Sequence, residues 1–212
     1  MHIRPRDLLL AFVLVVTWGG SFTVIKLGLG DVPPMLLWCL RYLLSAFPAL
    51  FFFERPRIAW RWWLAYGLTV GVGQFALLFL AVMLGLPAGI ASVALQAQAF
   101  FTLILARFFL GETIRWIQWA GMAMACLGLW LLMAPISHGT NETAPAAFAL
   151  VLGAAASWAA SNVVLKQAKQ ADRHPERFHI LGFIVWTSLI PPLPFATLSW
   201  GLGEVPSAWS AI

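Results

Sequence analysis

Long apolar stretches separated by short polar connectors run through the whole sequence. A helix needs about 20 mostly apolar residues to cross the hydrocarbon core of a bilayer. A segment in lipid must also satisfy its own backbone polar groups, and these stretches lack the alternation of barrel strands. The pattern therefore predicts an all-α polytopic membrane protein. Its transmembrane helices are expected over residues 8–27, 34–53, 62–84, 88–109, 116–134, 146–166 and 179–198.

The composition agrees with this interpretation and excludes a water-soluble domain. Apolar residues make up 61% of the 212 and charged residues only 10%, whereas a soluble domain has about 25% charged residues. The net charge of +5 does not indicate a nucleic-acid partner, because the basic residues are scattered between apolar stretches. Cys39 and Cys126 fall inside predicted spans without CxxC spacing. We expect no disulfide, metal or cofactor.

The basic residues predict the orientation of the chain. Eleven of the 13 Lys and Arg lie before the first span, or within or directly beside the connectors after the second, fourth and sixth spans. The connectors 28–33, 85–87 and 135–145 contain none. Cytoplasmic loops carry an excess of Lys and Arg, so the N-terminus is predicted to be cytoplasmic.

One motif occurs twice. A shift of 140 positions places Trp18 on Trp158, Ser21 on Ser161 and Lys26 on Lys166. An odd number of spans separates the copies, so the two halves are expected to be inverted, as in many secondary transporters. We predict a first repeat over residues 1–138 and an incomplete second repeat over residues 139–212. Seven helices of an expected ten are then present, and the chain is expected to lack about three.

Several motifs resemble the EamA family of the drug/metabolite transporter superfamily. They are Trp18-Gly19-Gly20-Ser21-Phe22, Arg41, Leu110-Gly111-Glu112, Gly121 and the repeated Trp158…Lys166. The stretches 87–92 and 95–102 are similar to the branch that exports cysteine and O-acetylserine from bacteria. The resemblance implies a ten-helix, non-enzymatic transporter of the bacterial inner membrane with both termini cytoplasmic. This sequence departs from that pattern because it ends after seven predicted helices.

Two polar residues inside spans are candidates for substrate binding, because polar groups in hydrocarbon are costly. Arg41 lies about 10 Å from the outer end of its helix at 1.5 Å per residue. It either pairs with a substrate carboxylate or snorkels to the interface. Gln74 shares a helix face with Gly67 and Gly71, and small residues allow another helix to approach. Gln74 either contacts substrate or bonds to that neighbouring helix.

Gln96 and Gln98 form a second candidate group. They lie about 200° apart around a helix, so both cannot face one cavity. Ser92 shares a face with Gln96, and Thr102 shares a face with Gln98. One pair is expected to line the substrate path and the other to join helices, and the sequence does not distinguish them.

The duplicated motif supplies the remaining candidates. Trp18 and Ser21 lie one turn apart beside two glycines, and Trp158 and Asn162 lie at the matching place in the second half. Such positions are natural cavity walls near a two-fold axis, although close helix packing explains them equally well. Lys26 and Lys166 end their helices, where a cation complements the helix dipole, and we prefer that role to ligand binding.

Three functional hypotheses follow. The leading one is a secondary-active exporter of small amino-acid metabolites, such as cysteine or O-acetylserine, that works by alternating access. The second is a non-transporting remnant, or a half-transporter that needs a partner chain, which leaves a homodimer open. The third, an integral-membrane lipid-modifying enzyme, lacks support because no HExxH or GxSxG motif is present. All acidic residues lie in loops or at helix ends, so no proton carrier is evident.

Overall fold

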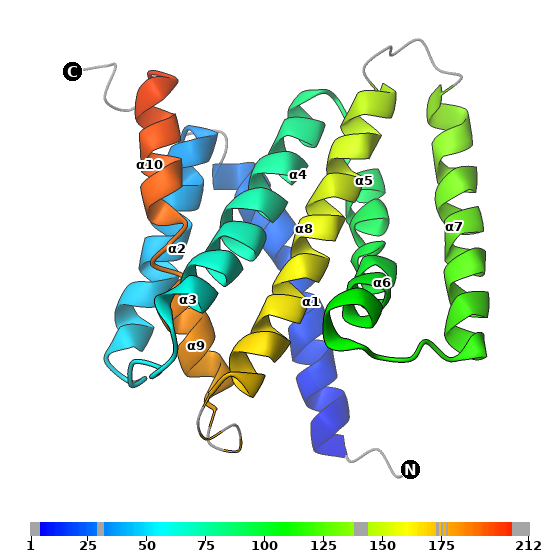
Figure 1. The fold of residues 1–212 in the computed structure, drawn as a ribbon. Coiled ribbons are helices and arrows are strands. Elements are labelled where there is room, and N and C mark those ends of the chain that lie inside the picture. Colours follow the sequence, from blue (N-terminus) through cyan, green and yellow to red (C-terminus); the bar gives the residue numbers. More distant parts are fainter. Residues whose placement is uncertain are drawn as a thin grey trace. The chain divides into compact units, whose positions relative to one another are not determined.

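The computed structural model describes residues 5–28, 32–137, 144–172, 174, 176 and 178–204, all of them in helices or connectors and none in a strand. The prediction of an all-α polytopic membrane protein is confirmed. The elements are the α-helices α1 (Pro5–Gly28), α2 (Pro34–Leu50), α3 (Trp60–Tyr66), α4 (Gln74–Met83), α5 (Ala88–Leu95), α6 (Gln98–Leu110), α7 (Trp116–Ser137), α8 (Ala144–Gln170), α9 (Ile180–Thr187) and α10 (Pro192–Gly201), and the π-helix η1 (Gly67–Gly73) (Figure 1).

Three of the predicted spans are interrupted helices. The span Trp60–Met83 consists of α3, the π-helical turns of η1 and α4. The span Ala88–Leu110 breaks between α5 and α6 at residues 96–97, and the span Ile180–Gly201 breaks between α9 and α10 at residues 188–191. These three spans, α7 and α8 are long and apolar enough to cross a membrane, and α2 is a shorter apolar helix.

The chain divides into two compact units. One contains residues 43–191, and the other contains residues 1–42 and 192–212. The division follows packing within the chain and differs from the two repeats predicted at residues 1–138 and 139–212, so the repeat boundaries stay a prediction.

In the larger unit α8 is the central helix, flanked by α3–η1–α4 and by α5–α6 (Figure 1). The contact surfaces consist mostly of alanine. Ala147, Ala154 and Ala155 of α8 are completely buried, as are Ala81 and Ala94 of the helices beside it. Small residues let helix backbones approach closely, which drives helix association where lipid removes the hydrophobic contrast.

In the smaller unit a carboxylate caps a helix from far along the chain. Glu204, just after α10, accepts hydrogen bonds from the backbone N–H groups of Met35 (3.1 Å) and Leu36 (3.3 Å) in the first turn of α2. These N–H groups have no partner within their own helix, and a negative charge complements the positive end of the helix dipole. The rings of Tyr42 and Phe195 also stack, with centroids 6.4 Å apart.

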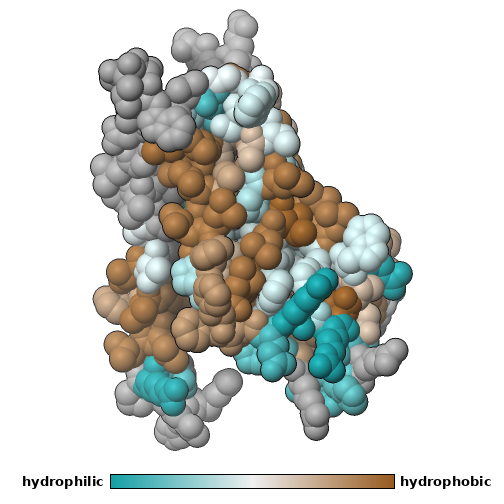
Figure 2. Space-filling model, turned by 90° about the vertical axis from the view of Figure 1, so that its left-hand side faces the viewer, coloured by the Kyte–Doolittle hydropathy of each residue, from teal (hydrophilic) through white to brown (hydrophobic). Residues whose placement is uncertain are grey.

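Large apolar side chains cover much of the exterior. On α7 they include Trp116, Met124 and Trp130, which are 80%, 75% and 65% exposed. Figure 2 shows brown, hydrophobic side chains over much of the coloured surface, with fewer teal, hydrophilic ones. An apolar exterior on a polytopic helical protein is the surface expected to face lipid.

Candidate functional site

The face of α3–η1–α4 predicted to pack inward does so. Gly67 and Gly71 are buried against the break between α9 and α10, where a Cβ on Gly67 would lie 2.6 Å from Ile190 Cβ and one on Gly71 would overlap Pro191. Glycine is therefore required at both positions for the helix break to approach this closely. Gln74, one turn further on, is buried as well.

The side-chain oxygen of Gln74 is a buried hydrogen-bond acceptor. Its side chain is only 5% exposed, and its Oε1 has no hydrogen-bond partner among the described residues. A buried acceptor costs about 1–3 kcal/mol when it has no partner, so Gln74 Oε1 is a candidate to accept a hydrogen bond from water or from a ligand. Gln74 also directly follows η1, and π-helical turns are frequent at functional sites.

The π-helical turns are joined to α8 by a serine. The backbone carbonyl of Thr69 accepts the N–H of Gln74, five residues on, and also the hydroxyl of Ser157 at 2.8 Å. Ser157 thus fixes the backbone at the start of α4, which positions Gln74. We did not select Ser157 from the sequence, although it lies beside Trp158 in the repeated motif and one turn before Ser161.

Gln98 and Asn162 are brought together. The Asn162 side-chain amide donates hydrogen bonds to Gln98 Oε1 and to Thr102 Oγ1, both at 3.2 Å. Both acceptors lie on α6 and the donor on α8, so the Gln98–Thr102 face joins two helices. Gln96 lies at the break between α5 and α6 and is exposed, whereas the hydroxyl of Ser92 donates to the backbone carbonyl of Gly89.

The repeated motif on α8 is mostly engaged within the protein. Ser161 is buried, and its hydroxyl donates to the backbone carbonyl of Trp158 at 2.6 Å. Trp158 is partly buried and packs against the alanine-rich core. In the first copy, the side chains of Trp18, Ser21 and Lys26 lie outside what the structure describes.

Arg41 belongs to the smaller unit, where it is exposed. Its guanidinium carbon lies 4.9 Å from the ring centroid of Trp38 and 5.7 Å from that of Tyr42. Cation–π contacts of this kind orient the side chain. The two units are separate bodies, so Arg41 and Gln74 are described as separate candidates.

The Leu110-Gly111-Glu112 motif ends α6 and connects it to α8. Gly111 adopts a left-handed conformation (φ 69°), which ends the helix and favours glycine. The carboxylate of Glu112 forms an ion pair with Lys166 of α8. Lys166 therefore does more than complement a helix dipole, because it joins the ends of two helices.

Comparison with known proteins gives consistent results. Residues 6–134 match the EamA-like transporter family. The chain is 46% identical to a "Probable amino-acid metabolite efflux pump" of Salmonella typhimurium over 90% of this chain and 62% of that protein. It is 43% identical to a protein of the same name from Escherichia coli over 92% of this chain and 64% of that protein.

A more distant relative is the "Uncharacterized inner membrane transporter YedA" of Escherichia coli, which is 29% identical over 72% of this chain and 50% of that protein. The chain thus spans about half to two thirds of the length of these relatives. No solved structure matches it.

Proposed function

The chain belongs to the EamA-like transporter family, and from this premise we propose that it exports small amino-acid metabolites, with cysteine and O-acetylserine as the first candidates. The supporting observation is the identity of this chain to two proteins that are each named "Probable amino-acid metabolite efflux pump". The identity is 43–46% over 90–92% of this chain. The chain covers 62–64% of the length of those proteins. The activity of the full-length protein is therefore a proposal.

The proposed mechanism is alternating access between inverted halves around a site near the middle of the membrane. An amino-acid metabolite carries a carboxylate and an ammonium group. We assign the carboxylate to the Arg41 guanidinium, which forms bidentate pairs with carboxylates. Separately from Arg41, we propose that Gln74 Oε1 in the larger unit is an acceptor for an ammonium group, because it has no hydrogen-bond partner among the described residues.

The other candidates take different parts in this proposal. The Asn162–Gln98 pair holds α6 to α8, and a ligand reaches it only by exchanging that hydrogen bond for its own. Gln96, beside the helix break, is proposed as the residue of this segment that lines the path. Trp18, Ser21 and Trp158 are proposed as cavity walls.

We propose the bacterial inner membrane as the location, with a cytoplasmic N-terminus. The support is the asymmetric distribution of Lys and Arg between alternate connectors, together with the name of the Escherichia coli relative, an inner membrane transporter.

The chain covers 62–64% of its efflux-pump relatives, so the natural length of the protein decides between an exporter and a half-transporter or remnant. The intact mass of the protein from its native membrane separates these readings. A mass of 23.3 kDa would direct attention to a partner chain, whereas about 8–10 kDa more would correspond to the three further helices of a complete inverted repeat.

Export from cells that produce the protein in its natural length tests the leading proposal. We expect Arg41→Ala to abolish export of cysteine and O-acetylserine while the protein still inserts into the membrane. Arg107→Ala, at an exposed arginine in the last turn of α6, is the matched control and is expected to export normally. Normal export by a well-expressed Arg41→Ala variant would remove Arg41 from the site.

A further inference from the structure

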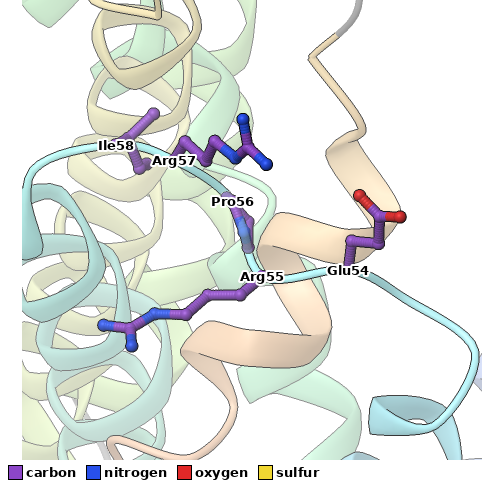
Figure 3. A pocket seen from close by; sticks show the side chains of 5 residues that line it. All are labelled: Glu54, Arg55, Pro56, Arg57 and Ile58. Carbon is purple, nitrogen blue, oxygen red and sulfur yellow. The ribbon is translucent and has the colours of Figure 1, made fainter.

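The connector between α2 and α3 forms a hollow on the surface of the larger unit. Five consecutive residues, Glu54–Ile58, line a volume of about 490 Å³ (Figure 3). Three of the five are charged, namely Glu54, Arg55 and Arg57, and all three are exposed. The proposed transport mechanism uses none of them.

The two arginines have different surroundings. The guanidinium carbon of Arg55 lies 4.9 Å from the ring centroid of Trp63 on α3, and this contact holds its side chain to one side of the connector. Figure 3 shows the Arg57 guanidinium and the Glu54 carboxylate extending to the other side. Among the described residues, neither Glu54 nor Arg57 forms an ion pair. One cation and one anion are therefore available to a ligand.

The hollow lies where a membrane-spanning helix meets water. Phe51 and Phe52, which precede it, are 79% and 83% exposed, and Trp60, which follows it, is 73% exposed. Tryptophan is enriched at this level of a bilayer, and phenylalanine presents apolar surface to the acyl chains. A molecule bound in the hollow thus has an apolar surface beside it, which suits a lipid better than a free solute.

We propose that this hollow binds the headgroup of phosphatidylethanolamine. Arg57 takes the phosphate, for which arginine offers a planar pair of N–H donors, and Arg55 adds positive charge nearby. The Glu54 carboxylate accepts N–H hydrogen bonds from the headgroup ammonium, and the acyl chains lie along the exposed phenylalanines. A purely anionic headgroup would place its negative charge near Glu54 without an ammonium to compensate it. The proposal requires only that the protein spans a membrane, so it is independent of what the protein transports.

Native mass spectrometry of the whole purified protein with equimolar phosphatidylethanolamine and phosphatidylglycerol tests the proposal. We expect the wild type to retain phosphatidylethanolamine about two- to fivefold better, the ratio expected for one exposed ion pair. Arg57→Gln should lower retention of both lipids. Glu54→Gln should remove the preference or turn it towards phosphatidylglycerol. Arg107→Gln, an exposed arginine on α6, is the matched control and should leave the preference unchanged.

Phosphatidylcholine provides a second readout, because its quaternary ammonium has no N–H to donate to Glu54. The wild type should retain phosphatidylcholine less well than phosphatidylethanolamine. The Glu54→Gln variant should retain these two lipids equally well. Three results would overturn the proposal: equal retention of the first two lipids by the wild type, a preference for phosphatidylglycerol, or displacement of the lipid by millimolar free phosphoethanolamine. The last result would indicate a site for a soluble ligand.

Discussion

Replacing Gln74 by methionine separates a ligand-binding role from a structural one. Methionine has nearly the volume of glutamine but no acceptor, so Gln74→Met removes the buried Oε1 that has no partner among the described residues. An unsatisfied buried acceptor costs about 1–3 kcal/mol. Removing it should therefore stabilise the substrate-free protein. For a chain of this size 1 kcal/mol corresponds to about 2–4 °C in melting temperature, which gives an expected increase of about 2–12 °C.

The same substitution should impair substrate binding. If Oε1 accepts the substrate ammonium, its loss costs about 1.5–3 kcal/mol, the value of a hydrogen bond to a charged group. Cysteine at ten times its wild-type Kd should stabilise the wild type by about 1.4 kcal/mol. At the same concentration it should stabilise Gln74→Met by about 0.3 kcal/mol at most. A variant that is more stable than the wild type but is no longer stabilised by substrate would identify Gln74 as a substrate-binding residue whose acceptor is unsatisfied without substrate.

Thermal unfolding of the detergent-solubilised protein, with and without cysteine or O-acetylserine, measures both effects. Gln170→Met, at an exposed glutamine that ends α8, is the matched control and should change neither. A lower melting temperature for Gln74→Met would show that Gln74 has a stabilising partner. An unchanged response to substrate would show that Gln74 does not bind it.

Four further substitutions, in three experiments, test the packing within the larger unit. Asn162→Leu should lower stability by about 1–3 kcal/mol, because Gln98 loses its hydrogen bond in a partly buried position; a melting temperature equal to that of the wild type would contradict this. Gly71→Val should prevent assembly of the larger unit because its side chain would overlap the helix break, whereas a normal yield of monodisperse protein would show that the break moves freely. In a double-mutant cycle, Glu112→Gln and Lys166→Gln should show a coupling of about 0.2–1 kcal/mol, because the pair is roughly half exposed; additive effects would mean that the ion pair contributes nothing.

Apolar patterning was enough to predict the helices. The stretch 88–109 is observed as Ala88–Leu110, and 62–84 as Trp60–Met83. The small-residue spacing of Gly67 and Gly71 also predicted correctly that Gln74 faces inward. These features depend only on neighbours along one helix, so the local sequence contains the information.

The helix interruptions were not predicted. The break before α10 has a local signal, since Pro191 and Pro192 lack N–H donors and restrict the residues before them. The break at residues 96–97 contains no glycine or proline, so the local sequence carries no signal for it. The π-helical turns depend on Ser157 of α8, which is 88 residues away from the Thr69 carbonyl it bonds.

The choice between the Gln96 and Gln98 faces also depended on a distant neighbour. Only the position of Asn162 shows that the Gln98 face joins two helices. Similarly, the Glu204 carboxylate caps a helix that begins 170 residues earlier in the chain, at Pro34. Hydrogen bonds between residues this far apart in the sequence leave no pattern in its hydropathy.

Counterflow in everted inner-membrane vesicles tests the central claim, export of amino-acid metabolites, most directly. Vesicles preloaded with unlabelled cysteine or O-acetylserine exchange it for external labelled compound without any coupling ion, so the assay does not depend on the energy source. We predict faster accumulation of label in vesicles that contain the protein than in vesicles without it, and slower accumulation with Gln74→Met. Equal accumulation with and without the protein, when its presence in the membrane is shown by immunoblot, would contradict the account.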